Sequence, residues 1–463
     1  MSKISKKIDR RDFLKLLGGA AAVTALDSCT GSAATSATVD NSSQQSDPGQ
    51  GMEYRVSATT GDKVSLLGYG CMRWPLLDKP AADGNVIDQE AVNELVDYAI
   101  EHGVNYFDTA PMYIQGWSEY TMGHALKRHP RESYMLATKL SNFNEKIWSR
   151  QESINMYNNS FKKLQVDYID YLLLHSVGSG NWEKFKGRYI DNGILDFLIE
   201  ERKKGRIRNL GFSFHGDISV FDYLLSRHEE IKWDFVQIQL NYVDWLYADP
   251  NRNVNAEYLY AELEKRNIGV IVMEPLLGGR LASLPKHLSS KLLERRPDDS
   301  IASWAFRYAA TFPKVLTVLS GMTYLEHLQD NIATYSSFEP ITTQENRLLM
   351  ETAKMLKEYP MIDCTACQYC MPCPYGIDIP GTFSHYNKCI NEGNYPIDTQ
   401  DENYAAERRA FLVGYDRSVP KLRQADHCIG CKKCEEHCPQ KIDISGDMKR
   451  VYKYVESLKQ NKF

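Results

Sequence analysis

The feature that most constrains this chain is the alternation of short apolar runs with helix-like segments between residues 55 and 337. Between the runs, apolar residues recur three and four positions apart, as in 89–101, which predicts amphipathic helices. Strands separated by helices pair in parallel, and eight such units predict an α/β fold of the (β/α)8, or TIM, barrel type. The eight runs cover residues 64–70, 104–107, 134–139, 168–175, 207–213, 235–240, 268–273 and 315–319.

A doubly wound parallel sheet is the alternative for this pattern. Such a sheet usually carries a glycine-rich phosphate-binding turn directly after its first strand. The first run ends in Gly68-Tyr-Gly70 and continues as Cys-Met-Arg, which lacks the spacing of that turn. The barrel is therefore the favoured prediction, and we place it at residues 52–340.

Composition bounds the number of domains and the class of partner. A chain of 463 residues is too long for one ordinary core, so a second domain is expected. The net charge of −5, without a basic stripe interleaved with aromatics, excludes nucleic acid as an expected partner. Eight of the 11 cysteines lie in two tight runs after residue 360, which indicates metal ligands rather than a disulfide framework.

The amino terminus has the features of an export signal. Arg10-Arg11-Asp-Phe-Leu-Lys15 precedes an apolar stretch, 16–26, that is too short to span a bilayer as a helix. The paired arginines with Phe-Leu-Lys resemble a twin-arginine signal, which implies export to the periplasm or cell envelope. We assign residues 1–29 to the signal and 30–51, rich in Ser, Thr and Gly, to a flexible linker.

Leu26-Asp-Ser-Cys29 is also similar to a lipoprotein cleavage box. Lipid on Cys29 would anchor the mature protein to a membrane. Asp27 stands where a small residue is usual in such a box. Two alternatives therefore remain, a lipidated Cys29 and an unmodified Cys29.

Polar residues end three consecutive strand-like runs. Asp108 follows the second run, Lys139 ends the third and His175 ends the fourth, while Tyr113 lies on the loop after Asp108. The carboxyl ends of barrel strands form the catalytic face, so these side chains should converge. Singly, each has a simpler explanation: a turn-forming Asp, an internal ion pair or a core histidine.

Together, Asp108, Tyr113, Lys139 and His175 resemble the catalytic tetrad of the aldo-keto reductases. The resemblance covers about 55–340 and includes Gly-x-x-Glu119-x-x-x-Gly123 after the tyrosine. It implies NAD(P)-dependent reduction of a small carbonyl compound, or the reverse oxidation of an alcohol. Tyr113 would donate the proton, and Lys139 beside it should lower the pKa of a phenol that is otherwise about 10. Asp108 would hold the lysine, and His175 would orient the carbonyl oxygen.

The same resemblance implies a nicotinamide cofactor. The family's Asn after strand five is Phe214 here, and its stacking aromatic after strand seven is Met273. Gly321 and His327 stand where cations would grip a 2′-phosphate, so NADP and NAD both stay open. The implied cofactor-binding residues are Ser213, Gln237, Pro275, Leu276, Gly278, Gly321, Asp330 and Asn331.

The cysteine runs resemble a bacterial-type ferredoxin with two [4Fe-4S] clusters, because each has a triplet followed by Cys-Pro. A pair of zinc sites is the alternative, but zinc sites have no need of Cys-Pro. The gap between the runs is long and helix-like at 383–392 and 403–412, so a small, mainly helical dicluster domain is expected within 341–463. The predicted ligands are Cys364, Cys367, Cys370, Cys373, Cys428, Cys431, Cys434 and Cys438.

The ferredoxin resemblance implies crossed ligation, in which the cysteine before each proline completes the other cluster. Cys438 would then join the first triplet and Cys373 the second. Cys71 and Cys389, outside the runs, are expected to be small buried residues.

The predicted twin-arginine signal and the predicted [4Fe-4S] clusters support one another. Twin-arginine export moves folded proteins, so clusters assembled in the cytoplasm would be kept. A redox protein is an expected partner. A rival hypothesis is an electron-transfer or docking module whose barrel works without nicotinamide, because a nicotinamide exchanges two electrons at once and each cluster accepts one.

Overall fold

The computed structural model describes residues 51–250 and 253–462, and the signal, the linker up to residue 50 and Cys29 lie outside them. Eight parallel strands close into a barrel, and the last of them pairs back onto the first. The predicted (β/α)8 barrel is thereby confirmed. Its strands are β3 (Leu67–Gly70), β4 (Tyr106–Asp108), β5 (Met135–Leu140), β6 (Ile169–Val177), β7 (Ile207–Phe214), β8 (Phe235–Gln239), β9 (Gly269–Met273) and β10 (Val315–Ser320).

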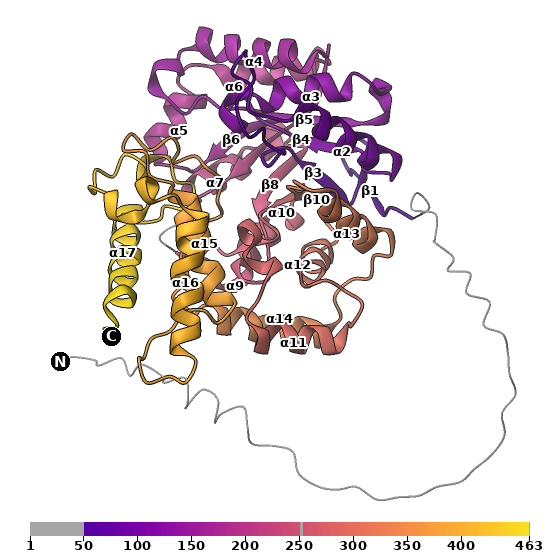
Figure 1. Cartoon of the computed structure of the whole chain (residues 1–463). Helices are drawn as coiled ribbons and strands as arrows, with labels where there is room; N and C mark the ends of the chain where they lie inside the picture. The colour runs from indigo at the N-terminus through magenta and orange to yellow at the C-terminus, as the bar shows by residue number, and fades with distance from the viewer. Residues whose placement is uncertain (1–50, 251–252, 463) are drawn as a thin grey trace, which may run out of the picture. The chain divides into compact units, whose positions relative to one another are not determined.

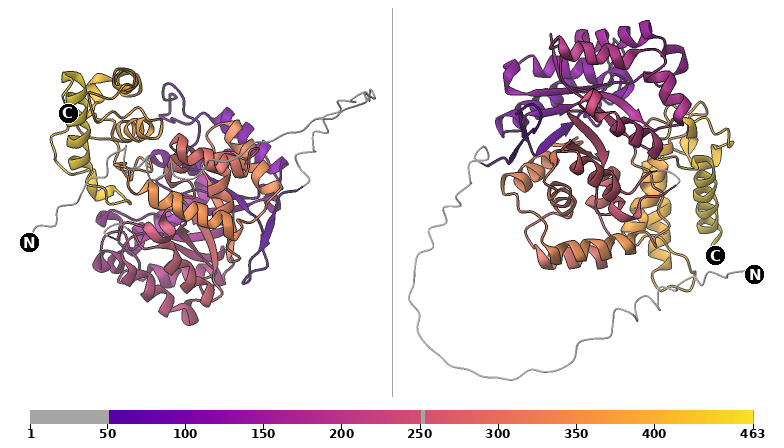
Figure 2. Two further views of the ribbon diagram at one scale, coloured as in Figure 1. Left: turned by 90° about the horizontal axis from the view of Figure 1, so that it is seen from below. Right: turned by 180° about the vertical axis from the view of Figure 1, so that it is seen from behind.

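Helices surround the barrel strands, as Figures 1 and 2 show from three sides. Their starts follow the sequence, since Asp88, Ser149 and Ser300 each accept a hydrogen bond from a backbone N–H of the first turn. The helices of this region are α2 (Gln89–Glu101), α3 (Ser118–Leu126), α4 (Arg150–Leu164), α5 (Trp182–Tyr189), α6 (Ile194–Lys203), α7 (Ile218–Ser226), α8 (His228–Ile231), α9 (Asp244–Tyr247), α10 (Ala256–Lys265), α11 (Lys286–Arg295), α12 (Ile301–Ala310), α13 (Leu325–Ser336) and α14 (Thr343–Leu356).

The first predicted strand, 64–70, is in fact divided. Its first part is β2 (Lys63–Ser65), which pairs antiparallel with β1 (Tyr54–Val56), and only β3 belongs to the barrel. Asp62 in the hairpin turn accepts hydrogen bonds from Tyr171 and Asn209 inside the barrel. The hairpin is therefore a plug over the amino-terminal end of the barrel, and a continuous apolar run could not reveal this bend.

The carboxyl-terminal region has its own core of aromatic and aliphatic side chains, including Phe383, Tyr386, Phe411 and Met448. It is built from α15 (Ile379–Asn391), α16 (Tyr404–Ser418) and α17 (Ile444–Gln460), drawn in orange to yellow in Figure 1. The helices predicted between the cysteine runs are present, while α17 was not predicted. Cys71 and Cys389 are buried, as expected. Across the described residues, every helix is too short or too polar to cross a bilayer.

Gly123 permits the close packing of α3 on α4. A Cβ atom there would lie 2.2 Å from the carbonyl oxygen of Lys163, a backbone atom that cannot move aside alone. We expect Gly123→Ala to lower the free energy of unfolding by about 1–3 kcal/mol, the cost of overpacking. His124→Ala, at the exposed neighbouring position of α3, is the control in denaturant unfolding. Equal stability of the two variants would contradict the packing role.

Candidate active site

A cavity of about 620 Å³ opens at the carboxyl ends of the barrel strands. It collects almost all of the barrel residues singled out in the sequence, although they come from strands and loops far apart along the chain. Lys139 does not line it and instead lies buried beside Asp108. The predicted residues that line the cavity are Asp108, Tyr113, His175, Ser213, Gln237, Pro275, Leu276, Gly278, Gly321, Asp330 and Asn331.

A buried ion pair lies at the floor of the cavity. The Lys139 ammonium, at the end of β5, donates to Asp108 Oδ1 at 2.5 Å and to the Thr109 carbonyl at 2.8 Å. Gln237 of β8 donates to the other Asp108 oxygen at 3.2 Å. Burial raises the pKa of Asp108, and the interactions with Lys139 and Gln237 oppose the rise. The pair thus involves three barrel strands, the neighbours β4 and β5 and, across the barrel, β8.

Tyr113 lies on a single 3-10 turn, Tyr113–Gly116, in which Ile114 and Gln115 have left-handed backbone angles. Its ring covers the lysine, with Lys139 Nζ 4.7 Å from the ring centre. Burial raises the pKa of Tyr113 well above its ordinary value, with Asp108 adding to the rise. The lowering of the Tyr113 pKa expected from Lys139 is therefore not found, because the effect of burial dominates.

His175 is held in its neutral form. Burial lowers the pKa of its imidazole well below the usual value, and the positive charges of Lys139 and Arg188 lower it further. Its Nδ1 lies 2.6 Å from the Ser141 hydroxyl. A serine that donates to Nδ1 leaves the ring hydrogen on Nε2. The histidine can then donate one hydrogen bond without carrying charge.

The predicted cofactor-binding residues are already held by neighbours. Ser213 accepts a hydrogen bond from the Ser176 N–H at 2.7 Å, and Asn331 donates to Ser320 at 3.0 Å. Asp330 accepts from the Ser300 hydroxyl at 2.7 Å. Gly278, after β9, has a positive φ of 71°, which glycine adopts without strain. These side chains line one cavity with fixed orientations.

Several cavity residues were missed in the sequence. From the barrel they are Met72, Arg73, His215 and Glu274, on loops after strands, and His215 has a pKa lowered to about 4 by burial. From the carboxyl-terminal region they are Cys367, Tyr369, Pro439 and Gln440. Cys367 was predicted as a cluster ligand, but no local sequence signal places this second group at the barrel, because its approach depends on contacts between distant segments.

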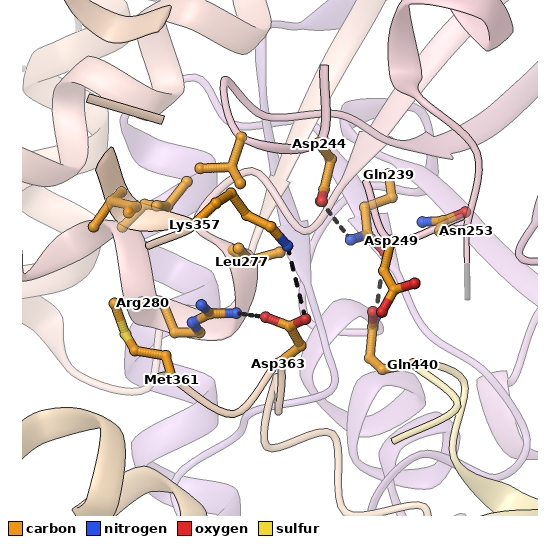
Figure 3. A pocket seen from close by; sticks show the side chains of 13 residues that line it. Gln239, Asp244, Asp249, Asn253, Leu277, Arg280, Lys357, Met361, Asp363 and Gln440 are labelled. Carbon is orange, nitrogen blue, oxygen red and sulfur yellow. Dashed lines mark hydrogen bonds and ion pairs between the residues drawn. The ribbon is translucent and has the colours of Figure 1, made fainter. Parts of the chain in front are cut away.

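A small pocket beside this cavity shows how the two regions meet (Figure 3). Arg280, in the loop after β9, forms an ion pair with Asp363 at 2.8 Å, and Lys357 approaches the same carboxylate at 4.0 Å. Gln440 donates to Gln239 of β8 at 3.3 Å. Arg280 does not line the large cavity.

The cysteines form two groups. A second small pocket is lined by Cys364, Cys367, Cys370 and Cys438. Cys434 lies close enough to Cys428 and Cys373 for their charges to interact. Cys431 is exposed. The first group thus gathers the first triplet with the cysteine before the second proline.

The first group has the composition that a [4Fe-4S] cluster requires, four cysteine sulfurs around one space, with apolar Ile379, Phe383 and Ile442 beside them. Burial raises the pKa of the Cys364 thiol to about 11, and bound iron would favour the thiolate. Among the residues described, no three His, Cys, Asp or Glu side chains are placed to hold a single metal ion.

Family comparisons divide the chain into three parts. Residues 66–354 match the aldo/keto reductase family, and residues 363–442 match the 4Fe-4S dicluster domain. Residues 7–26 match the signal sequence of the twin-arginine translocation pathway, which supports export by that route. The order along the chain is the predicted one.

Similar proteins match the barrel. An L-galactose dehydrogenase from Arabidopsis thaliana is 27% identical over 66% of this chain and 96% of its own. An NADH-specific methylglyoxal reductase from Escherichia coli (strain K12) is 25% identical over 59% of this chain and 91% of its own. The holo form of aldo-keto reductase AKR11C1 from Bacillus halodurans superposes with a TM-score of 0.51 at 26% identity, covering 65% of this chain and 96% of that one. With the family match covering more than half of its length, the chain belongs to the aldo/keto reductase family.

Proposed function

We propose that this protein is an NAD(P)-dependent oxidoreductase that reduces a small carbonyl compound or oxidises the corresponding alcohol. One observation carries the proposal: Tyr113, His175 and Gln237 line a single cavity that continues to Asp330 and Asn331. Two relatives named for carbonyl or alcohol chemistry, the methylglyoxal reductase and the galactose dehydrogenase, support this substrate class.

Each tetrad residue has a role that follows from its position. Tyr113 delivers a proton to the carbonyl oxygen as the alcohol forms, and His175 donates a hydrogen bond to the same oxygen from Nε2. Asp108 holds Lys139 in place beneath the Tyr113 ring, and the Lys139 ammonium supplies positive charge near the developing alkoxide. In the reverse direction Tyr113 accepts the proton of the alcohol.

The cofactor residues divide by position along the cavity. Ser213 and Gln237 would hold the nicotinamide, which supplies the hydride when bound. The loop with Pro275, Leu276 and Gly278 would lie against the pyrophosphate, and Gly321, Asp330 and Asn331 against the adenosine. These residues fit a nicotinamide dinucleotide. The glycines of the loop leave its backbone accessible to the pyrophosphate, and the polar side chains converge on one cavity.

The cysteine groups would hold two [4Fe-4S] clusters that exchange electrons with a redox protein partner. Cys364, Cys367 and Cys370 would share one cluster with Cys438, and Cys373 would share the other with Cys428, Cys431 and Cys434. With its export signal, the protein would act in the periplasm or cell envelope, tethered there if Cys29 is lipidated.

A second function, an electron-transfer module whose barrel works without nicotinamide, is favoured by one observation. Cys367, a proposed cluster ligand, lines the same cavity as Tyr113. Titration of the anaerobically purified protein with NADH and NADPH, followed by cluster EPR, separates the two functions. Saturable binding of either nucleotide supports the reductase, and binding of neither supports the electron-transfer module.

Tyr113→Phe tests the proton donor. The variant should bind nucleotide normally and lose about 10²-fold or more in the turnover of a small aldehyde, the usual effect of removing a positioned acid. Tyr120→Phe, which changes a partly exposed tyrosine on α3, should keep full turnover. Unchanged carbonyl reduction by Tyr113→Phe would remove the tetrad assignment.

Nucleotide preference tests the adenosine end of the cavity. Because Gly321 and His327 replace the expected cations, we expect NADPH to bind no more than about tenfold tighter than NADH, since a charge-assisted contact of about 1.5–3 kcal/mol is missing. Equilibrium fluorescence titration measures both dissociation constants. A preference above about a hundredfold would contradict this expectation. Arg73, which packs against Gly321, would then be the phosphate ligand, and Arg73→Gln should abolish the preference.

Cys438→Ser tests the crossed ligation. It should perturb the cluster held by the first triplet and leave the other at least partly intact, because Cys438 lines the pocket of Cys364, Cys367 and Cys370. Iron analysis and EPR measure the loss, and Cys389→Ser, at a buried cysteine outside both groups, is the control. Damage confined to the cluster of Cys428, Cys431 and Cys434 would show that each run binds its own cluster.

A further inference from the structure

The first cysteine loop, defined here as residues 363–370, forms part of the wall of the barrel cavity. Two of its residues, Cys367 and Tyr369, line the cavity, and so do Pro439 and Gln440 directly after Cys438. Both segments that would hold the first cluster therefore face the space that contains Tyr113 and His175.

Barrel residues fix this loop in place. Arg73, after β3, donates to the Thr365 carbonyl, and Arg280 pairs with Asp363 (Figure 3). Gly278 lies so close that a Cβ atom there would be 2.3 Å from the Thr365 Cα. Gln440 is bonded to Gln239. Since the contacts to residues 363–370 come from the loops after two barrel strands, β3 and β9, the first cysteine loop has one position relative to the cavity.

Tyr369 of the first cysteine loop contacts Tyr113, the proposed proton donor. It lies between Cys367 and Cys370, it lines the same cavity as Tyr113, and the two hydroxyls are hydrogen-bonded to one another. A Tyr113 oxygen that accepts from Tyr369 has its own hydrogen free to point at a substrate oxygen. Tyr113 can thus keep this contact and still serve as the donor to a substrate oxygen.

We propose that Tyr369 is a positioning residue for Tyr113 and that, through this contact, the first cluster and the group bound in the barrel cavity are energetically coupled. The assignment rests on the proposed function for the role of Tyr113. Coupling between two sites is reciprocal, so a change at either site must alter the properties of the other. The second cluster, whose proposed ligands do not line the cavity, should be unaffected.

The coupling can be measured without substrate or nucleotide. In the full-length holoprotein, Tyr113→Phe removes the hydrogen-bond partner of the Tyr369 hydroxyl, although residue 113 lies in the barrel and ligates no iron. We expect it to change the EPR spectrum and midpoint potential of the first cluster, identified through Cys438→Ser, while those of the second stay as in wild type. Tyr452→Phe, at an exposed position of α17, is the control. Wild-type properties of the first cluster in Tyr113→Phe would overturn the coupling.

Tyr369→Phe tests positioning. We expect kcat for a small aldehyde to fall about tenfold, the scale of one lost hydrogen bond, with KM and the nucleotide dissociation constant within about twofold of wild type. The double variant Tyr113→Phe/Tyr369→Phe should shift the first-cluster potential no further than Tyr113→Phe alone, because both remove one contact. Unchanged kcat in Tyr369→Phe, or additive shifts in potential, would overturn the assignment. Failure of the proposed function is distinct, since it appears as unchanged turnover in Tyr113→Phe.

Discussion

The active-site arrangement depends on the ion pair between Asp108 and Lys139. Both side chains are almost fully buried, and each charge is tolerated there only because the other is present. Removing one partner of such a pair typically costs about 3–5 kcal/mol. The pair connects two neighbouring strands, supports the Tyr113 ring and is held in turn by Gln237 across the barrel. Asp108, Lys139 and Gln237 therefore form a single electrostatic unit at the cavity floor. A substitution at one of these residues also affects the other two.

The sequence predicts the barrel well because barrel strands are short, apolar and bounded by polar ends. Asp108, Lys139 and His175 could be predicted because each lies at the end of such a run. Asp108 and His175 line the cavity. The division between β2 and β3 could not be found, since no glycine, proline or other turn signal separates Ser65 from Leu67. Tyr369 and Arg73 could not be found either, because the contacts that place them in the site join residues hundreds of positions apart or in different domains.

The electrostatic state of Tyr113 shows what local reasoning overlooks. A lysine beside a phenol suggests a lowered pKa, yet in the fold the lysine is engaged by Asp108 and Thr109 and burial dominates. Tyr369, from the carboxyl-terminal region, is hydrogen-bonded to the Tyr113 hydroxyl. The pKa of a buried side chain thus depends on neighbours that only tertiary structure supplies.

The placement of Cys438 beside the first triplet has a consequence for biogenesis. The ribosome makes the barrel first, but a first cluster completed by Cys438 has to wait until the second cysteine run has been synthesised. Truncated or stalled chains would then hold a barrel whose cavity lacks a wall. Completion of the cavity would thereby follow synthesis of both cysteine runs, inside the cell, before a folded protein is passed to the export machinery.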